Sequence, residues 1–220
     1  MTVKALIFDM DGLMIDSERL YFQAEREIAA KFGKQVKDET LWRMMGRKPL
    51  ESLEIYVREA GIPAAAAEIL EMRNGIMLEK MKHDLRPMPG LDHILAAFHG
   101  KTKLAVCTGA QKDFLDFVLD KLGIRGRFDV LQSSDGVAVG KPDPEIYLTT
   151  CARLEIEPRD GVVLEDSANG VLAGKRAGCY VIAVPSEYTR RQDFFSADFI
   201  ARDLVDASGH IGGLSEPNPF

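Results

Sequence analysis

Asp9 and Asp11 stand one residue apart, directly after the apolar run Ala5–Phe8. That run is typical of a buried strand, and uncompensated charge at the mouth of a buried strand is costly. Side chains two residues apart leave an extended segment in the same direction, so both carboxylates would face one place. Either the pair shapes the turn that follows, or it supplies oxygen ligands to a divalent cation.

Three other segments place polar groups at expected strand ends or just before a helix. In an open parallel sheet, ligands bind beyond the carboxyl ends of the strands, and the topology would bring these segments to one edge. They are Thr108-Gly109 after the run 103–107, Lys141 in a loop before a helix that starts with Asp143 and Pro144, and Glu165-Asp166 after the run 161–164.

Taken one at a time, each group has an ordinary structural explanation. Thr108 and Asp166 would cap helices, and Lys141 would be a solvated loop cation. Taken together, three or four converging carboxylates repel one another unless a divalent cation lies among them. Oxygen-only ligands predict Mg²⁺, which usually shares its shell with water and a substrate phosphate. Lys141, the Thr108 hydroxyl and the backbone N–H groups from Gly109 onward would then hold phosphate oxygens.

The elements that must position these groups follow from hydrophobic periodicity. Short β-rich runs alternate with helix-length segments, which indicates βαβ units and a parallel sheet covered on both faces. The expected strands are Val3–Phe8, Lys103–Cys107, Phe128–Leu131, Gly161–Leu164, Tyr180–Val184 and a weaker one near Phe199–Ile200. The predicted fold class is therefore α/β, with a Rossmann-like parallel sheet.

The long segment between the first two strands lacks a convincing strand pattern. The helices that it predicts instead span 17–31, 50–60 and 64–82. A helical insertion is therefore expected over residues 17–86, while residues 1–16 and 87–220 form a discontinuous α/β core. From Ala207 onward, the Gly, Ser and Pro content predicts an exposed extension.

The bulk composition limits the classes of binding partner and the cellular compartment that we expect. A formal net charge of -6 and a pI near 5.3 argue against nucleic acid or an anionic membrane as a partner, so an anionic substrate must meet local cations. The sequence shows no secretory signal pattern and no apolar run long enough to span a bilayer. The spacing of Cys107, Cys151 and Cys179 suits reduced, buried thiols. We expect a cytoplasmic monomer that acts on a small phosphorylated metabolite.

Four motifs, in order, resemble those of the haloacid dehalogenase-like superfamily. The resemblance is to the branch with a helical cap after the first strand, which includes β-phosphoglucomutase and many small-metabolite phosphatases. DMDGLMIDSE resembles the first motif and VCTGA the second, while Lys141 within GKPDPEIY resembles the third and VVLEDSANGVLAGKRAG the fourth. Order, spacing and length match as far as about Asp206. The resemblance implies an α/β core with a small all-helical cap.

The resemblance also implies a division of roles in phosphoryl transfer. Asp9 would be the nucleophile that forms an aspartyl-phosphate, and Asp11 would serve as acid for the leaving oxygen and then as base for water. Thr108 and Lys141 would balance charge on the transferring phosphoryl group. The ligands implied for Mg²⁺ are the Asp9 carboxylate, the Asp11 backbone carbonyl, Asp166 and, directly or through water, Glu165.

The choice between hydrolase and mutase depends on the cap. In β-phosphoglucomutase, a His shortly after the first motif pairs with a cap Lys and suppresses hydrolysis; the matching residues here align as Tyr21 and Arg73. Because a tyrosine cannot act as an imidazolium near neutral pH, the sequence favours a Mg²⁺-dependent phosphatase, with a β-phosphoglucomutase-type sugar phosphomutase as the alternative. Arg47 and Lys48 in a cap loop would touch the distal part of the substrate. Equally, Tyr21, Arg47 and Lys48 would be ordinary packing or turn residues.

Overall fold

The computed structural model describes residues 2–45 and 49–215. The chain divides into two compact units, one formed by Met1–Ile15 with Pro87–Phe220 and the other by Asp16–Arg86. We call the first the core unit and the second the helical unit. Every strand within the described residues belongs to the core unit, and the helical unit lies in sequence between the first strand and the second.

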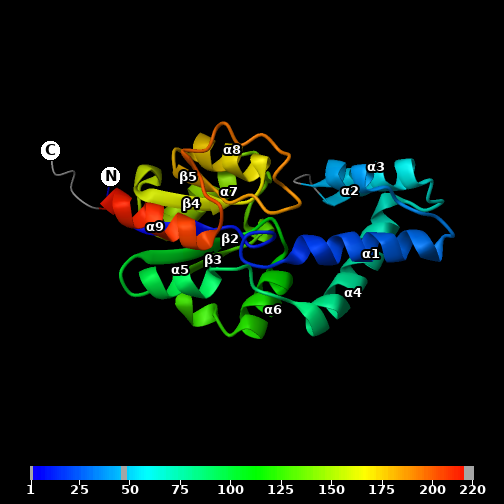
Figure 1. Ribbon diagram of the computed structural model, residues 1–220, viewed down its shortest axis with the longest axis horizontal. Helices are drawn as coiled ribbons and strands as arrows, with labels where there is room; N and C mark the ends of the chain where they lie inside the picture. Colours follow the sequence, from blue (N-terminus) through cyan, green and yellow to red (C-terminus); the bar gives the residue numbers. More distant parts are fainter. Residues whose placement is uncertain (1, 46–48, 216–220) are drawn as a thin grey trace. The chain divides into compact units, whose positions relative to one another are not determined.

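Within the described residues, six strands form one parallel sheet in the order β3-β2-β1-β4-β5-β6, which confirms the predicted Rossmann-like fold class (Figure 1). The strands are β1 (Ala5–Phe8), β2 (Lys103–Cys107), β3 (Val130–Gln132), β4 (Gly161–Glu165), β5 (Tyr180–Ala183) and β6 (Phe199–Ile200). β3 begins later than expected, although the Asp129 N–H already donates to the Leu104 oxygen at 2.8 Å. The Asp129 carboxylate accepts the Leu104 N–H at 2.8 Å.

The central strand of the site is β1, which lies between β2 and β4. Phe8 pairs with Val106 on one side and with Leu164 on the other, so these three strands end at the same level. All four residues of β1 are fully buried, as expected for a strand covered on both faces of a parallel sheet. The residues that follow the three strands therefore emerge together at one edge.

Helices cover both faces of this sheet. Those of the core unit are α5 (Leu91–Phe98), α6 (Lys112–Leu122), α7 (Glu145–Arg153), α8 (Ala168–Ala177) and α9 (Leu204–Ser215), with 3₁₀ turns η1 (Arg125–Arg127), η2 (Ser134–Gly136) and η3 (Pro158–Asp160). α7 and α8 pack on one face over a buried cluster that includes Ile7 and Tyr147, and Figure 1 shows α5 and α6 on the other side. Among the helices of the described chain, none has the length and apolar character needed to cross a membrane.

Between Ala207 and Ser215 the structure corrects one expectation, because this segment belongs to helix α9 and not to the predicted exposed extension, whose last residues, 216–220, lie outside the described residues. Leu204, Ala207 and Ile211 are buried, and α9 packs against α5. These apolar residues recur at helical spacing, and that periodicity outweighs the helix-weakening glycines between them. Composition alone therefore misidentified the region.

The helical unit is made of α1 (Ser17–Lys31), α2 (Asp38–Met44), α3 (Pro49–Ala60) and α4 (Ala66–Asp84). α1 packs along α4, and α2 packs along α3. The buried Tyr56 hydroxyl of α3 donates to the Glu25 backbone oxygen of α1 at 2.5 Å. The sequence did not predict α2, since about two turns of helix are too short to show a repeating apolar face.

The two ends of the helical unit are bound to each other. The Asp16 N–H donates to the Arg86 backbone oxygen at 3.0 Å. The Arg19 guanidinium forms ion pairs with Asp16 at 2.9 Å and with Asp84 at 2.7 Å. These contacts hold the start of α1 beside the end of α4, so the insertion begins and ends at neighbouring points.

The buried centre of the sheet can be tested by comparing two phenylalanines. Phe8 is fully buried, and its ring meets the Phe128 ring edge to face with centroids 6.1 Å apart. We expect Phe8→Ala to lower the free energy of unfolding by about 3–5 kcal/mol, because it leaves a cavity beside the central strand. Phe195 is 92% exposed, so Phe195→Ala should change that free energy by less than about 0.5 kcal/mol. Urea unfolding measures both values, and equal losses would contradict the burial of β1.

Candidate active site

Buried carboxylates gather where β1 and β4 end. Carboxylate oxygens of Asp9, Glu165 and Asp166 lie within 4.8 Å of one another. All three residues are buried, and Glu165 is completely inaccessible. The in-register pairing of β1 with β4 brings them together, and the Asp9 N–H continues the ladder by donating to the Leu164 oxygen at 3.0 Å. The sheet therefore joins the first and fourth motifs, as the sequence predicted.

The turn after β1 leaves room for this cluster. Gly12 has a φ of +78°, and its N–H donates to the Ile15 oxygen at 3.0 Å. A Cβ at Gly12 would overlap the Asp166 carboxylate. A glycine is therefore required here both for the backbone conformation and for the close approach of Asp166.

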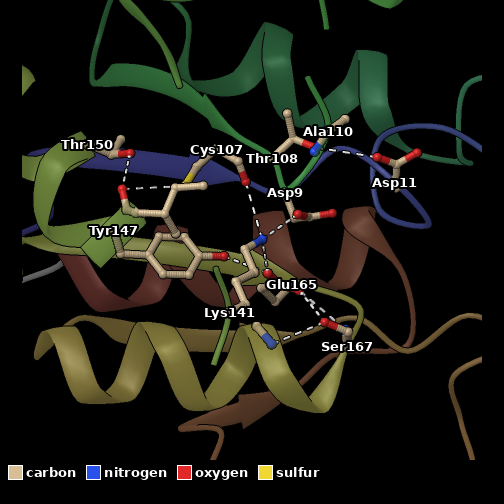
Figure 2. Close-up of polar contacts among 12 residues, drawn as sticks. Asp9, Asp11, Cys107, Thr108, Ala110, Lys141, Tyr147, Thr150, Glu165 and Ser167 are labelled. Atoms are coloured by element: carbon tan, nitrogen blue, oxygen red, sulfur yellow. Dashed lines mark hydrogen bonds and ion pairs between the residues drawn. The ribbon is translucent and has the colours of Figure 1, made fainter. Parts of the chain in front are cut away.

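The ammonium group of Lys141 lies among the carboxylates (Figure 2). Its Nζ is 2.5 Å from Asp9 Oδ1 and 2.5 Å from Glu165 Oε1, and it also donates to the Cys107 backbone oxygen at 3.3 Å. The side chain is 13% exposed. Lys141 is thus a partly buried counter-ion of the cluster, which rules out the alternative of a solvated loop cation.

Burial and mutual repulsion set the electrostatics of the cluster. Burial raises the pKa of Asp9 to about 8; the Lys141 ammonium opposes this rise, while Glu165 and Asp11 contribute to it. Burial lowers the pKa of Lys141, but attraction to Asp9 and Glu165 outweighs it and raises that pKa above its ordinary value. Lys141 therefore stays charged, and one positive charge faces three carboxyl groups. A further cation would favour the ionised form of Asp9.

Thr108 lies at the end of β2 and links the second motif to Asp11. Its hydroxyl donates to Asp11 Oδ2 at 3.4 Å and accepts the Ala110 N–H at 3.0 Å (Figure 2). Thr108 is buried, whereas the neighbouring Gly109 is exposed. The structure therefore brings Asp11 and Thr108 together, and it leaves the backbone of Gly109 open to solvent.

The helix-cap explanations for Thr108 and Asp166 do not hold. α6 begins at Lys112, after Gln111. Ser167 caps α8, because its hydroxyl accepts the Gly170 N–H at 3.1 Å. These ordinary roles are therefore excluded for both side chains.

The helical unit contains the residues predicted from the cap. The Arg73 guanidinium lies over the Tyr21 ring at 5.2 Å from its centroid and forms an ion pair with Glu25 at 3.7 Å. Arg73 and Glu25 are both buried, and burial raises the pKa of Glu25 to about 7 against the attraction of Arg73. The structure thus pairs Tyr21 with Arg73. Arg47 and Lys48 lie outside the described residues.

Sequence reasoning missed three residues around Glu165. The Tyr147 hydroxyl donates to Glu165 Oε1 at 2.6 Å, and the Ser167 hydroxyl donates to Oε2 at 3.1 Å. At Gly170, a Cβ would overlap the Glu165 carboxylate. A signal for Tyr147 existed, because it lies on the first turn of the helix that follows Lys141, beside the buried and apolar Ile146. The Tyr147 hydroxyl therefore needed a buried partner.

The residues present fit a divalent cation. The cluster offers buried carboxylate oxygens from two strand ends, and Gly12 provides the space that keeps Asp166 in the cluster. Hard oxygen donors of this kind suit Mg²⁺ better than metals that prefer sulfur or imidazole. The excess of carboxyl groups over the single ammonium group gives an electrostatic reason for such an ion.

Comparison with known proteins agrees with this geometry. The model of the haloacid dehalogenase-like hydrolase family matches residues 3–178. A phosphorylated carbohydrates phosphatase from Thermotoga maritima is 37% identical over 182 residues, which cover 80% of this chain and 82% of the relative. The fructose-1-phosphate phosphatase YqaB from Escherichia coli is 30% identical over 183 residues, which cover 81% of this chain and 95% of the relative. These relatives confirm the prediction of a phosphoric monoester hydrolase.

A solved structure shows the same similarity in three dimensions. The crystal structure of CbbY from Rhodobacter sphaeroides in complex with phosphate has a TM-score of 0.82 and 27% identity, over 93% of this chain and 96% of the other. The family match runs from the first strand to the end of α8 and includes Asp9, Lys141 and the Glu165-Asp166 pair. The chain therefore belongs to the haloacid dehalogenase-like hydrolases.

Proposed function

We propose that the protein is a Mg²⁺-dependent phosphatase that hydrolyses a small phosphorylated carbohydrate through an aspartyl-phosphate intermediate. The observation that carries this proposal is the position of Asp9, which lies at the end of the central strand in contact with Lys141 and beside the carboxylates of Glu165 and Asp166. A nucleophilic carboxylate, a fixed ammonium group and a set of cation ligands are the parts that phosphoryl transfer requires.

In the first step, a carboxylate oxygen of Asp9 attacks the phosphorus of the ester. The bond between phosphorus and the ester oxygen breaks, and Asp11 gives a proton to that oxygen as the alcohol leaves. In the second step, the ionised Asp11 takes a proton from water, and the water oxygen attacks phosphorus. The bond to Asp9 then breaks, and inorganic phosphate leaves. Lys141 and Thr108 hold phosphoryl oxygens in both steps.

Mg²⁺ would be held by the carboxylates of Asp9 and Asp166 and by the backbone carbonyl of Asp11. When bound, it offsets the negative charge of the phosphoryl group as the carboxylate approaches. Glu165 belongs to the same cluster, and its direct neighbours are Lys141 and Ser167. In this structure the Thr108 hydroxyl donates to Asp11 Oδ2, and it would turn that single proton toward a phosphoryl oxygen when the ester binds.

The names of two relatives support a phosphorylated carbohydrate as the substrate class. Two relatives are named for phosphorylated carbohydrates and for fructose 1-phosphate.

Hydrolase and phosphomutase differ in what accepts the phosphoryl group from Asp9, which is water in a hydrolase and a sugar hydroxyl in a mutase. Tyr21 aligns with the histidine that suppresses hydrolysis in β-phosphoglucomutase, and a tyrosine does not form an imidazolium, so we favour water as the acceptor.

A panel of sugar phosphates and nucleotides tests the reaction class. The wild-type protein with Mg²⁺ should release inorganic phosphate from at least one sugar phosphate, and EDTA should stop the release until Mg²⁺ is restored. Asp9→Asn should lower kcat by a factor of at least about 10³, because it removes the nucleophile. The exposed Asp113→Asn on α6 is the matched control and should leave kcat unchanged.

Two results would decide against this function. If folded, Mg²⁺-supplied protein released phosphate from no member of the panel, the phosphatase proposal would fail. If it converted β-glucose 1-phosphate to glucose 6-phosphate after priming by a sugar bisphosphate, without phosphate release, the protein would be a mutase.

The role of Asp11 can be separated from that of Asp9 by the choice of leaving group. An aryl phosphate has a leaving group that needs no proton, whereas a sugar phosphate needs one. We expect Asp11→Asn to lower kcat for the sugar phosphate by a factor of about 10²–10⁴. With the aryl phosphate it should give a rapid release of aryl alcohol equal to the enzyme concentration, followed by slow turnover, because water is no longer activated. Stopped-flow absorbance measures this burst, and equal slowing of both substrates without a burst would contradict the assignment.

A further inference from the structure

Glu165 is fully buried, and donors from the protein occupy both of its carboxylate oxygens. Oε1 accepts from Lys141 Nζ at 2.5 Å and from the Tyr147 hydroxyl at 2.6 Å. Oε2 accepts from the Ser167 hydroxyl at 3.1 Å and from the Ser167 N–H at 3.3 Å. A buried carboxylate is stable only when such donors replace its lost water, so the orientation of Glu165 depends on them.

Tyr147 contacts two members of this group at once. It projects from the first turn of α7, is fully buried, and directs its hydroxyl at Glu165 (Figure 2). The Lys141 ammonium lies 5.1 Å from the centroid of the Tyr147 ring, within the range of a cation–π contact. The ring and the hydroxyl therefore act on different partners, and a substitution can separate them.

We propose that the Tyr147 hydroxyl is a positioning group of the active site: by donating to Glu165 Oε1, it fixes the carboxylate that holds Lys141 beside Asp9. The inference rests on the proposed function of this cluster. Oε1 accepts from a neutral and a charged donor, and the two together fix the direction of the Glu165 carboxylate. Without the hydroxyl, Lys141 is the remaining side-chain donor to Oε1 among the contacts described, so the carboxylate can turn and holds the ammonium less firmly beside Asp9.

Loss of the Tyr147 hydroxyl should therefore affect both the affinity for Mg²⁺ and the rate of the chemical step. Asp9 and Asp166 are the carboxylates assigned to Mg²⁺, and Glu165 is the neighbour whose charge and orientation shape their surroundings. Loss of a group that orients the immediate surroundings of a metal typically costs about 10–100-fold in metal affinity or activity. Tyr147 is fully buried and presents no surface to a substrate, so the KM should be largely insensitive to its hydroxyl.

The test is Tyr147→Phe, which keeps the ring and its contact with Lys141 but removes the hydroxyl. We expect the dissociation constant for Mg²⁺, measured by calorimetry on the substrate-free protein, to rise about tenfold and kcat to fall about tenfold. The KM should change by less than about twofold, as expected when a group acts on the chemical step and not on substrate binding.

Thr150→Val is the matched control. Thr150 is fully buried on the same helix, and its hydroxyl donates to the Ile146 oxygen at 2.7 Å, away from Glu165. This variant should bind Mg²⁺ and turn over like the wild-type protein, and its thermal stability shows the cost of removing one buried hydroxyl from α7.

The outcomes separate this inference from the proposed function. If Tyr147→Phe matches Thr150→Val in Mg²⁺ affinity and kcat while the wild-type protein is active, the inference is overturned and the phosphatase proposal stands. If the wild-type protein hydrolyses no ester but binds Mg²⁺ about tenfold more tightly than Tyr147→Phe, the positioning role stands and the phosphatase proposal fails. A wild-type protein that binds no Mg²⁺ overturns the inference.

Discussion

The ion pairs that Lys141 forms with Asp9 and Glu165 are the interaction on which the core unit depends. The pairing of β1 with β4 forces carboxyl groups from distant parts of the sequence into a buried space. Without a cation there, the register that buries the apolar residues of both strands would also bury repelling charges. The loop before α7 supplies the cation, so the placement of that helix and the stability of the sheet edge are linked.

The sequence was sufficient for most of this arrangement because two simple periodicities dominate the chain. The strands around β1 are continuous apolar runs, and such runs fix a parallel sheet and the edge at which its polar ends meet. The sequence alone therefore predicts that Asp9, Lys141 and Asp166 lie together. Helical spacing of apolar residues likewise revealed α1, and a composition rich in helix-forming residues revealed α4.

What the sequence did not reveal depends on contacts between side chains that periodicity does not encode. Tyr147 looked like one more apolar residue of a helix, and its partnership with Glu165 arises from the way α7 crosses the sheet. α9 was hidden because its glycines and serines resemble a loop, although its buried residues follow helical spacing. The composition of a segment reports only its average preference for helix or loop, whereas its burial depends on the apolar residues at a few positions.

Because its two ends lie next to each other, the helical unit could be replaced by another compact fold. The Asp16 N–H bonds to the Arg86 oxygen, and Ile15 bridges to Pro87 in the core unit, so the chain departs and returns through adjacent points. A loop closed in this way can contain any compact fold whose own ends lie together, and its length adds little to the entropy of closing it. The sheet and its carboxylates could therefore stay constant during evolution while the inserted unit changed in size, sequence and ligand preference.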